Sequence, residues 1–100
     1  MKNPQQKIRL LMEMGAGSLV ENTVNKLIII QIARYQAFAE QMRPELRTFE
    51  EKFRMSSEEC YHRFDAGELG DAGDYFEWVG LYENLLLCQE RISMLRASLQ

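Results

Sequence analysis

Two stretches of the chain carry apolar side chains at alternating spacings of four and three residues. The first runs from residue 28 to residue 53, and the second from residue 78 to residue 99. This heptad spacing is typical of a helix that buries one side against another helix. Only two of the 100 residues are Pro and six are Gly, so few residues interrupt long helices. The sequence therefore predicts an all-α protein.

The two stripes predict an antiparallel hairpin of two long helices. We expect residues 22–100 to form this hairpin domain, with the first helix kinked or interrupted at Pro44. One seam leaves other apolar side chains uncovered, among them Leu27, Phe38 and Leu86. A homodimer that closes a four-helix bundle would cover them, and so would a different partner chain. The seam, within the chain or across a dimer, is predicted to use Ile28, Ile32, Tyr35, Met42, Leu81, Leu85 and Ile92.

A short corner helix is expected between the two long ones. Ser56 and Glu59 have the Ser-x-x-Glu spacing of a capping box at a helix start. Gly67 is suited to end that helix, and the glycine-containing segment up to residue 73 predicts a turn. Asp74 with Glu77 is predicted to cap the last helix.

The N-terminal segment, residues 1–21, is the least defined part of the sequence. Apolar residues alternate between positions 8 and 14, which favours a short strand. Ile8, Leu11 and Met12 also fit one turn of a helix, which is the alternative. Residues 15–17, Gly-Ala-Gly, are predicted to form a hinge.

Charge and cysteine content favour a cytoplasmic protein that does not bind nucleic acid by itself. The net charge is −3 and the isoelectric point is about 5.2, which gives no general reason to expect DNA, RNA or anionic lipid as a partner. Cys60 and Cys88 lack CxxC spacing and are interpreted as reduced thiols. No apolar run approaches the roughly 20 residues that span a bilayer, so no membrane association is expected.

Candidate chemistry is sparse, and the sequence predicts neither an enzyme nor a bound cofactor. Glu59 and His62 have the Glu-x-x-His spacing of di-iron bundles, which need two such motifs. A dimer could supply both from one histidine per chain, so a di-iron protein is one alternative. A capping glutamate beside a surface histidine is the simpler interpretation. No nucleophile and base stand out as a pair.

Acidic residues gather at the corner between the predicted helices. Residues 51–77 hold eight acids and three bases, a net charge of −5, whereas residues 1–50 have a net charge of +2. Aromatic residues surrounded by charge are typical of protein interfaces, although they could equally fill the core of the corner. The candidate partner-binding residues are Asp71, Asp74, Tyr75, Phe76 and Trp78.

Residues 49–59, 64–71 and 74–78 together resemble a group of small prokaryotic helical proteins that are similar to antitoxins of type II toxin–antitoxin pairs. The resemblance covers about residues 22–95. It implies an acidic helical protein that binds and neutralises a small basic toxin, often a ribonuclease. A structural or adaptor homodimer without a toxin partner is the alternative that needs no such partner.

Overall fold

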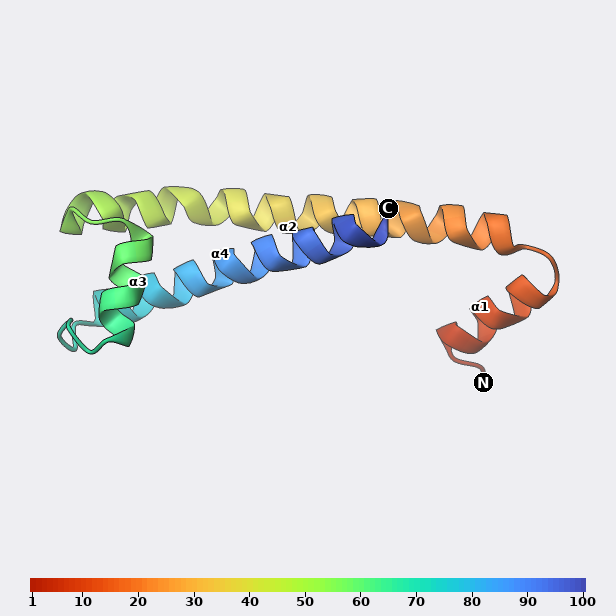
Figure 1. The fold of residues 1–100 in the computed structure, drawn as a ribbon, viewed down its shortest axis with the longest axis horizontal. Helices are drawn as coiled ribbons and strands as arrows, with labels where there is room; N and C mark the ends of the chain where they lie inside the picture. Colours follow the sequence, from red (N-terminus) through yellow and green to blue (C-terminus); the bar gives the residue numbers. More distant parts are fainter.

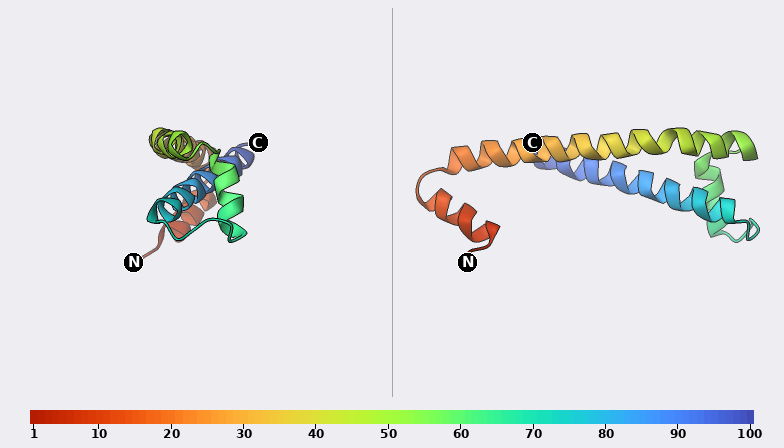
Figure 2. Two further views of the ribbon diagram at one scale, coloured as in Figure 1. Left: turned by 90° about the vertical axis from the view of Figure 1, so that its left-hand side faces the viewer. Right: turned by 180° about the vertical axis from the view of Figure 1, so that it is seen from behind.

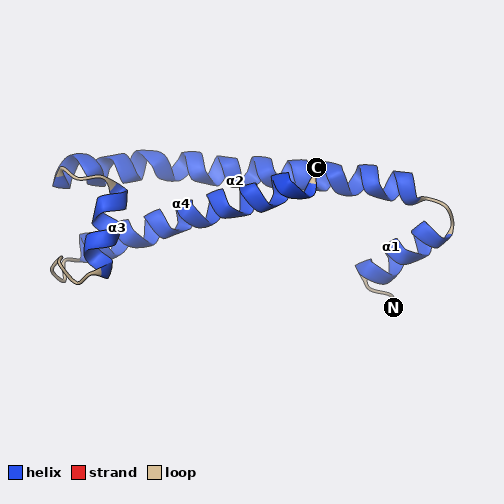
Figure 3. Ribbon diagram, viewed as in Figure 1, coloured by secondary structure: helices blue, strands red, loops and turns tan.

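The computed structural model describes residues 1–100 and is built from helices without any strand (Figure 3). This confirms the prediction of an all-α fold with two long helices and a short corner helix. In chain order, the elements are α1 (Pro4–Glu13), α2 (Gly17–Phe53), α3 (Ser57–Asp65) and α4 (Gly73–Ser98).

Helices α2 and α4 pack side by side as an antiparallel hairpin (Figure 1). The C-terminal end of α4 lies beside the first half of α2, and the first turns of α2 extend beyond the hairpin (Figures 1 and 2). The molecule measures 60 × 24 × 22 Å, and its radius of gyration is 19.9 Å. A compact 100-residue domain would have a radius of gyration of about 13 Å. The chain is therefore a long, thin body that can bury few residues.

The predicted seam holds α2 against α4 within one chain. Ile32 and Leu85 are buried, and Tyr35, Met42 and Leu81 pack partly buried against the core cluster. Ile28 and Ile92 are half-buried along the same seam. The heptad stripes thus account for the contact between the two long helices.

The two fully buried side chains, Trp78 and Cys60, lie at the corner, and Trp78 has no solvent-accessible surface. Its ring stacks on Phe49 and Phe53, with ring centroids 5.7 and 5.6 Å away. Its indole Nε1–H donates to Ser57 Oγ at 2.9 Å, and the Ser57 hydroxyl donates to Glu50 Oε2 at 2.8 Å. The backbone N–H of Ser57 donates to the same carboxylate oxygen at 2.9 Å, so Glu50 also satisfies a free donor at the start of α3.

The predicted N-terminal strand is wrong, because residues 4–13 form helix α1. Asn3 and Gln6 make a reciprocal capping box: each side chain accepts a hydrogen bond from the other residue's backbone N–H. Pro4 stands at the first turn, where its fixed φ suits a helix. Gly15 has a φ of 88°, and the chain reverses there into α2, which begins at Gly17 rather than near residue 22. No residue of α1 is buried.

One prediction about a helix end is confirmed and one is corrected. Helix α2 runs to Phe53 as predicted, and it continues through Pro44 without interruption. Asp74 does not cap α4: the N-cap position is Ala72, which makes no side-chain capping bond, and Asp74 pairs with Lys52 at 2.9 Å. The Ser56 cap of α3 is confirmed by the bond from the Glu59 backbone N–H to Ser56 Oγ at 3.0 Å.

Candidate protein-binding surfaces

The first candidate surface, here called the acidic corner, comprises the exposed carboxylates of α3, of the following turn and of the first turns of α4, together with Phe76. Phe76 is 59% exposed, and its ring meets Phe64 edge-on with the centroids 5.0 Å apart. One side of Phe76 is thus held in place while the rest faces solvent. The exposed carboxylates are Glu58, Glu59, Asp65, Glu68, Asp71 and Glu77.

The five predicted partner-binding residues differ in how they are placed. Asp71 and Phe76 are exposed, and Asp71 takes part in no ion pair. Asp74 is half-buried in its pair with Lys52, and Tyr75 packs on Phe53 with centroids 4.9 Å apart. Trp78 is fully buried, so it belongs to the core and cannot itself contact a partner.

The structure places Glu59 and His62 on the solvent-facing side of α3. The carboxylate within ion-pair distance of His62 belongs to Glu58, at 3.9 Å, and both side chains are at least 70% exposed. No group of three or more His, Cys, Asp or Glu side chains is arranged to hold a metal ion. Di-iron bundles carry ligands that project into the bundle core, which is not where these residues lie.

The fold shifts the acidity of two partly or fully buried side chains, Cys60 and Tyr82. Burial raises the pKa of the Cys60 thiol above its ordinary value, and the nearby Arg63 only partly opposes this. Burial also raises the pKa of the Tyr82 hydroxyl, with the charges of Glu58 and Glu50 adding to the effect. A thiol that is buried and protonated at neutral pH is a core residue rather than a nucleophile.

The second candidate surface, here called the apolar groove, runs along one flank of the α2–α4 seam. Its helix α2 wall includes Tyr35, Phe38 and Met42, and its helix α4 wall includes Leu87 and Met94. Phe38, Leu87 and Met94 are 50%, 41% and 64% exposed. The remaining lining residues are Gln31, Gln41, Asn84, Cys88, Arg91 and Leu95.

Arg91 is the one charged side chain that lines the apolar groove. It donates to the Tyr35 hydroxyl at 2.9 Å, and its guanidinium lies 5.6 Å from the centroid of the Tyr35 ring. This contact draws Arg91 across the seam from α4 to α2. A hydrogen bond and a cation–π contact therefore link the two walls of the apolar groove.

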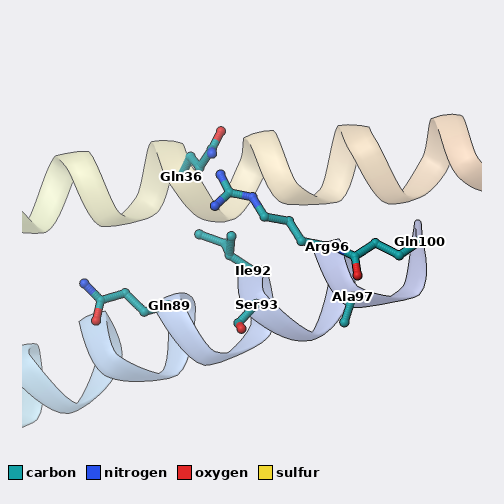
Figure 4. Close-up of a pocket in the computed structure, with 7 residues that line it drawn as sticks. All are labelled: Gln36, Gln89, Ile92, Ser93, Arg96, Ala97 and Gln100. Carbon is teal, nitrogen blue, oxygen red and sulfur yellow. The ribbon is translucent and has the colours of Figure 1, made fainter.

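The opposite flank of the same seam is polar. Gln36, Gln89 and Arg96 line a groove there, and Figure 4 shows Arg96 reaching from α4 toward α2 near Gln36. The helical period separates Gln36 from Phe38 by two residues, or about 160° around α2, so the two grooves face in different directions. The two grooves thus differ in polarity: the first is lined mostly by apolar side chains and the second mostly by polar ones.

The total exposed area of the chain is large for its mass. It is 7604 Å², whereas a compact monomer of 11.7 kDa would expose about 5,900 Å². Only nine residues are buried. The excess of about 1,700 Å² is as large as the total area that a standard protein–protein interface buries.

Sequence patterns missed part of this arrangement. Leu87 and Met94 were not identified as binding residues from the sequence. Their separation of seven residues places them on one side of α4, beside the seam, and this spacing could have identified them. The role of Glu50 at the start of α3 was also missed, because a capping partner seven residues away leaves no local motif.

No helix is both long and apolar enough to cross a bilayer. Comparisons with protein-family models, curated proteins and solved structures find no match to this chain.

Proposed function

We propose that this protein acts by binding other protein chains. The observation that carries the proposal is the large exposed apolar surface of a chain that buries only nine residues. Exposed apolar surface of this extent in a small protein marks an interaction site. The proposal requires no catalytic residue and no cofactor.

We further propose an antitoxin-like role, in which the acidic corner binds a small basic toxin of the ribonuclease type. The resemblance of about residues 22–95 to antitoxin-like proteins suggests this partner. A ribonuclease must hold RNA phosphates, so its active surface is expected to be basic. The unpaired Asp71 and the exposed Phe76 support the proposal, because charge speeds encounter and an aromatic side chain supplies affinity.

A structural or adaptor homodimer without a toxin is the second candidate. The excess exposed area favours self-association with or without another partner. The outward position of Glu59 and His62 weighs against the di-iron alternative, since a metal site in the bundle core would need them to point inward.

Charge reversal at the acidic corner should slow binding of the basic partner. Asp71→Lys combined with Glu77→Lys changes two exposed carboxylates and leaves the Lys52–Asp74 pair intact. We expect the association rate at low salt to fall by about tenfold or more and its salt dependence to weaken. Stopped-flow binding to a small basic toxin, sought in the reading frame beside this gene, measures this rate, and growth rescue of cells that express the toxin gives a second readout.

The matched control is Glu13→Lys combined with Glu21→Lys. It produces the same change in net charge at exposed positions near the opposite end of the molecule. We expect this control to slow association much less than the corner variant. Equal binding and rescue by the folded corner variant and the wild type would rule out the acidic corner as the docking site.

A further inference from the structure

We propose that the apolar groove is the surface that binds a second copy of this chain, so that two hairpins close a four-helix bundle. This inference rests on the proposed self-association and adds which face forms the interface. The heptad seam is already used between α2 and α4 of one chain. The dimer contact must therefore include side chains beside the seam, and Phe38, Leu87 and Met94 are the largely exposed apolar residues that line the apolar groove.

The composition of the groove suits the buried centre of an interface. Centres of interfaces are poor in charged residues and rich in aromatic side chains, Met and Arg. The groove has Tyr35 and Phe38, two methionines, and Arg91 as its one charged residue. Because Arg91 already donates to Tyr35 and lies over its ring, its burial under a second copy would leave part of its hydrogen-bonding capacity satisfied.

The dimensions of the hairpin match what a stable dimer needs. Helix α4 has 26 residues, which gives a length of about 39 Å. Two packed helices present a face about 20 Å wide, so this flank offers about 800 Å². That is the area each partner buries in a standard interface. Burial of about 800 Å² would remove about half of the excess exposed area, which is the difference between this chain and a compact monomer of the same mass.

A second copy is the occupant that also solves the problem of the small core. A single hairpin buries one seam, whereas two hairpins packed on their apolar flanks enclose a bundle core. Two-fold symmetry is the commonest arrangement for such a pair, and it presents each groove to the other. The polar flank, with Gln36, Gln89 and Arg96, would then remain in solvent.

The test measures self-association of the full chain by sedimentation equilibrium over a range of concentrations. The wild type should be a dimer at micromolar concentration. Phe38→Asp and Met94→Lys each place a charge in the groove at a position that is at least half exposed in the single chain. We expect each to raise the dissociation constant of the dimer by at least about 100-fold while the helical circular dichroism signal of a folded chain remains.

Ile29→Asp is the matched control. Ile29 is 56% exposed on the same helix, but nine residues from Phe38 it points in the opposite direction around α2, about 180° away. The dissociation constant of the Ile29→Asp dimer should stay within a few-fold of the wild-type value.

A wild type that remains monomeric would overturn both the proposed self-association and the assignment of this groove. A wild-type dimer that Phe38→Asp and Met94→Lys leave intact, or that Ile29→Asp disrupts equally, would overturn the groove assignment alone. Neither result bears on toxin binding by the acidic corner.

Discussion

Leu85→Asp is expected to lower the free energy of unfolding by about 3–5 kcal/mol, because it buries a charge that has no partner. Leu85 is only 6% exposed and belongs to the same core cluster as Ala39 and Leu46. Small domains have total stabilities of the same order as this loss. The variant should therefore lose most of its helical structure at room temperature.

Urea denaturation followed by circular dichroism measures the effect. Leu86→Asp is the control, because Leu86 is the adjacent residue on α4 but is 36% exposed. Its carboxylate can remain in water, so we expect a loss of less than about 1 kcal/mol. If the two variants were equally stable, α2 and α4 would not pack through Leu85.

Replacement of Trp78 should have an effect of similar size at the corner. Trp78→Ala removes the stacked ring between Phe49 and Phe53 and leaves a cavity, for an expected loss of about 3–5 kcal/mol. Trp78→Phe keeps much of the ring volume but removes the Nε1–H bond to Ser57 Oγ. We expect the smaller loss of about 1–3 kcal/mol for that variant, because the Ser57 hydroxyl still donates to Glu50.

Chemical denaturation of both variants tests this order of stabilities. Phe76→Ala is the control on the same helix, since Phe76 is 59% exposed and its loss should cost less than Trp78→Ala. A Trp78→Ala protein as stable as the wild type would show that the ring is not part of the core. The residue would then return to the set of candidate partner contacts.

The stripes on α2 and α4 were enough to predict the hairpin, because heptad spacing reports directly which side of a helix is buried. The corner helix was likewise predictable from Ser56, whose side chain makes the expected capping bond to the Glu59 N–H. The alternation near residue 8 misled the interpretation of the N-terminus. There the capping box between Asn3 and Gln6, with Pro4 at the first turn, favours a helix.

Composition alone could not separate core residues from surface residues at the corner. Trp78 and Phe76 lie two residues apart within the same acidic and aromatic segment, yet one is fully buried and the other largely exposed. The difference depends on α2: Phe49 and Phe53 cover Trp78, and they lie 25 or more residues earlier in the chain. The pairing of Asp74 with Lys52 is a similar long-range contact, which replaced the predicted cap of α4.

The polarity difference between the two flanks of the hairpin also depends on long-range packing. The sequence indicated that apolar side chains would remain outside the seam, but it did not show which of them lie together. The structure brings Phe38 of α2 and Leu87 of α4 into one groove. It places Gln36 and Gln89 in another.

Hydroxyl-radical footprinting of the purified full chain tests most directly whether other protein chains cover its exposed side chains. At low concentration Phe38, Met94 and Phe76 should all be readily oxidised, since each is at least half exposed. As the concentration rises, Phe38 and Met94 should become protected as the second copy binds, whereas Phe76 should stay reactive until the basic partner is added. If oxidation of all three side chains were unchanged at every concentration, with and without that partner, no other protein chain would cover them, which would contradict the proposed binding function.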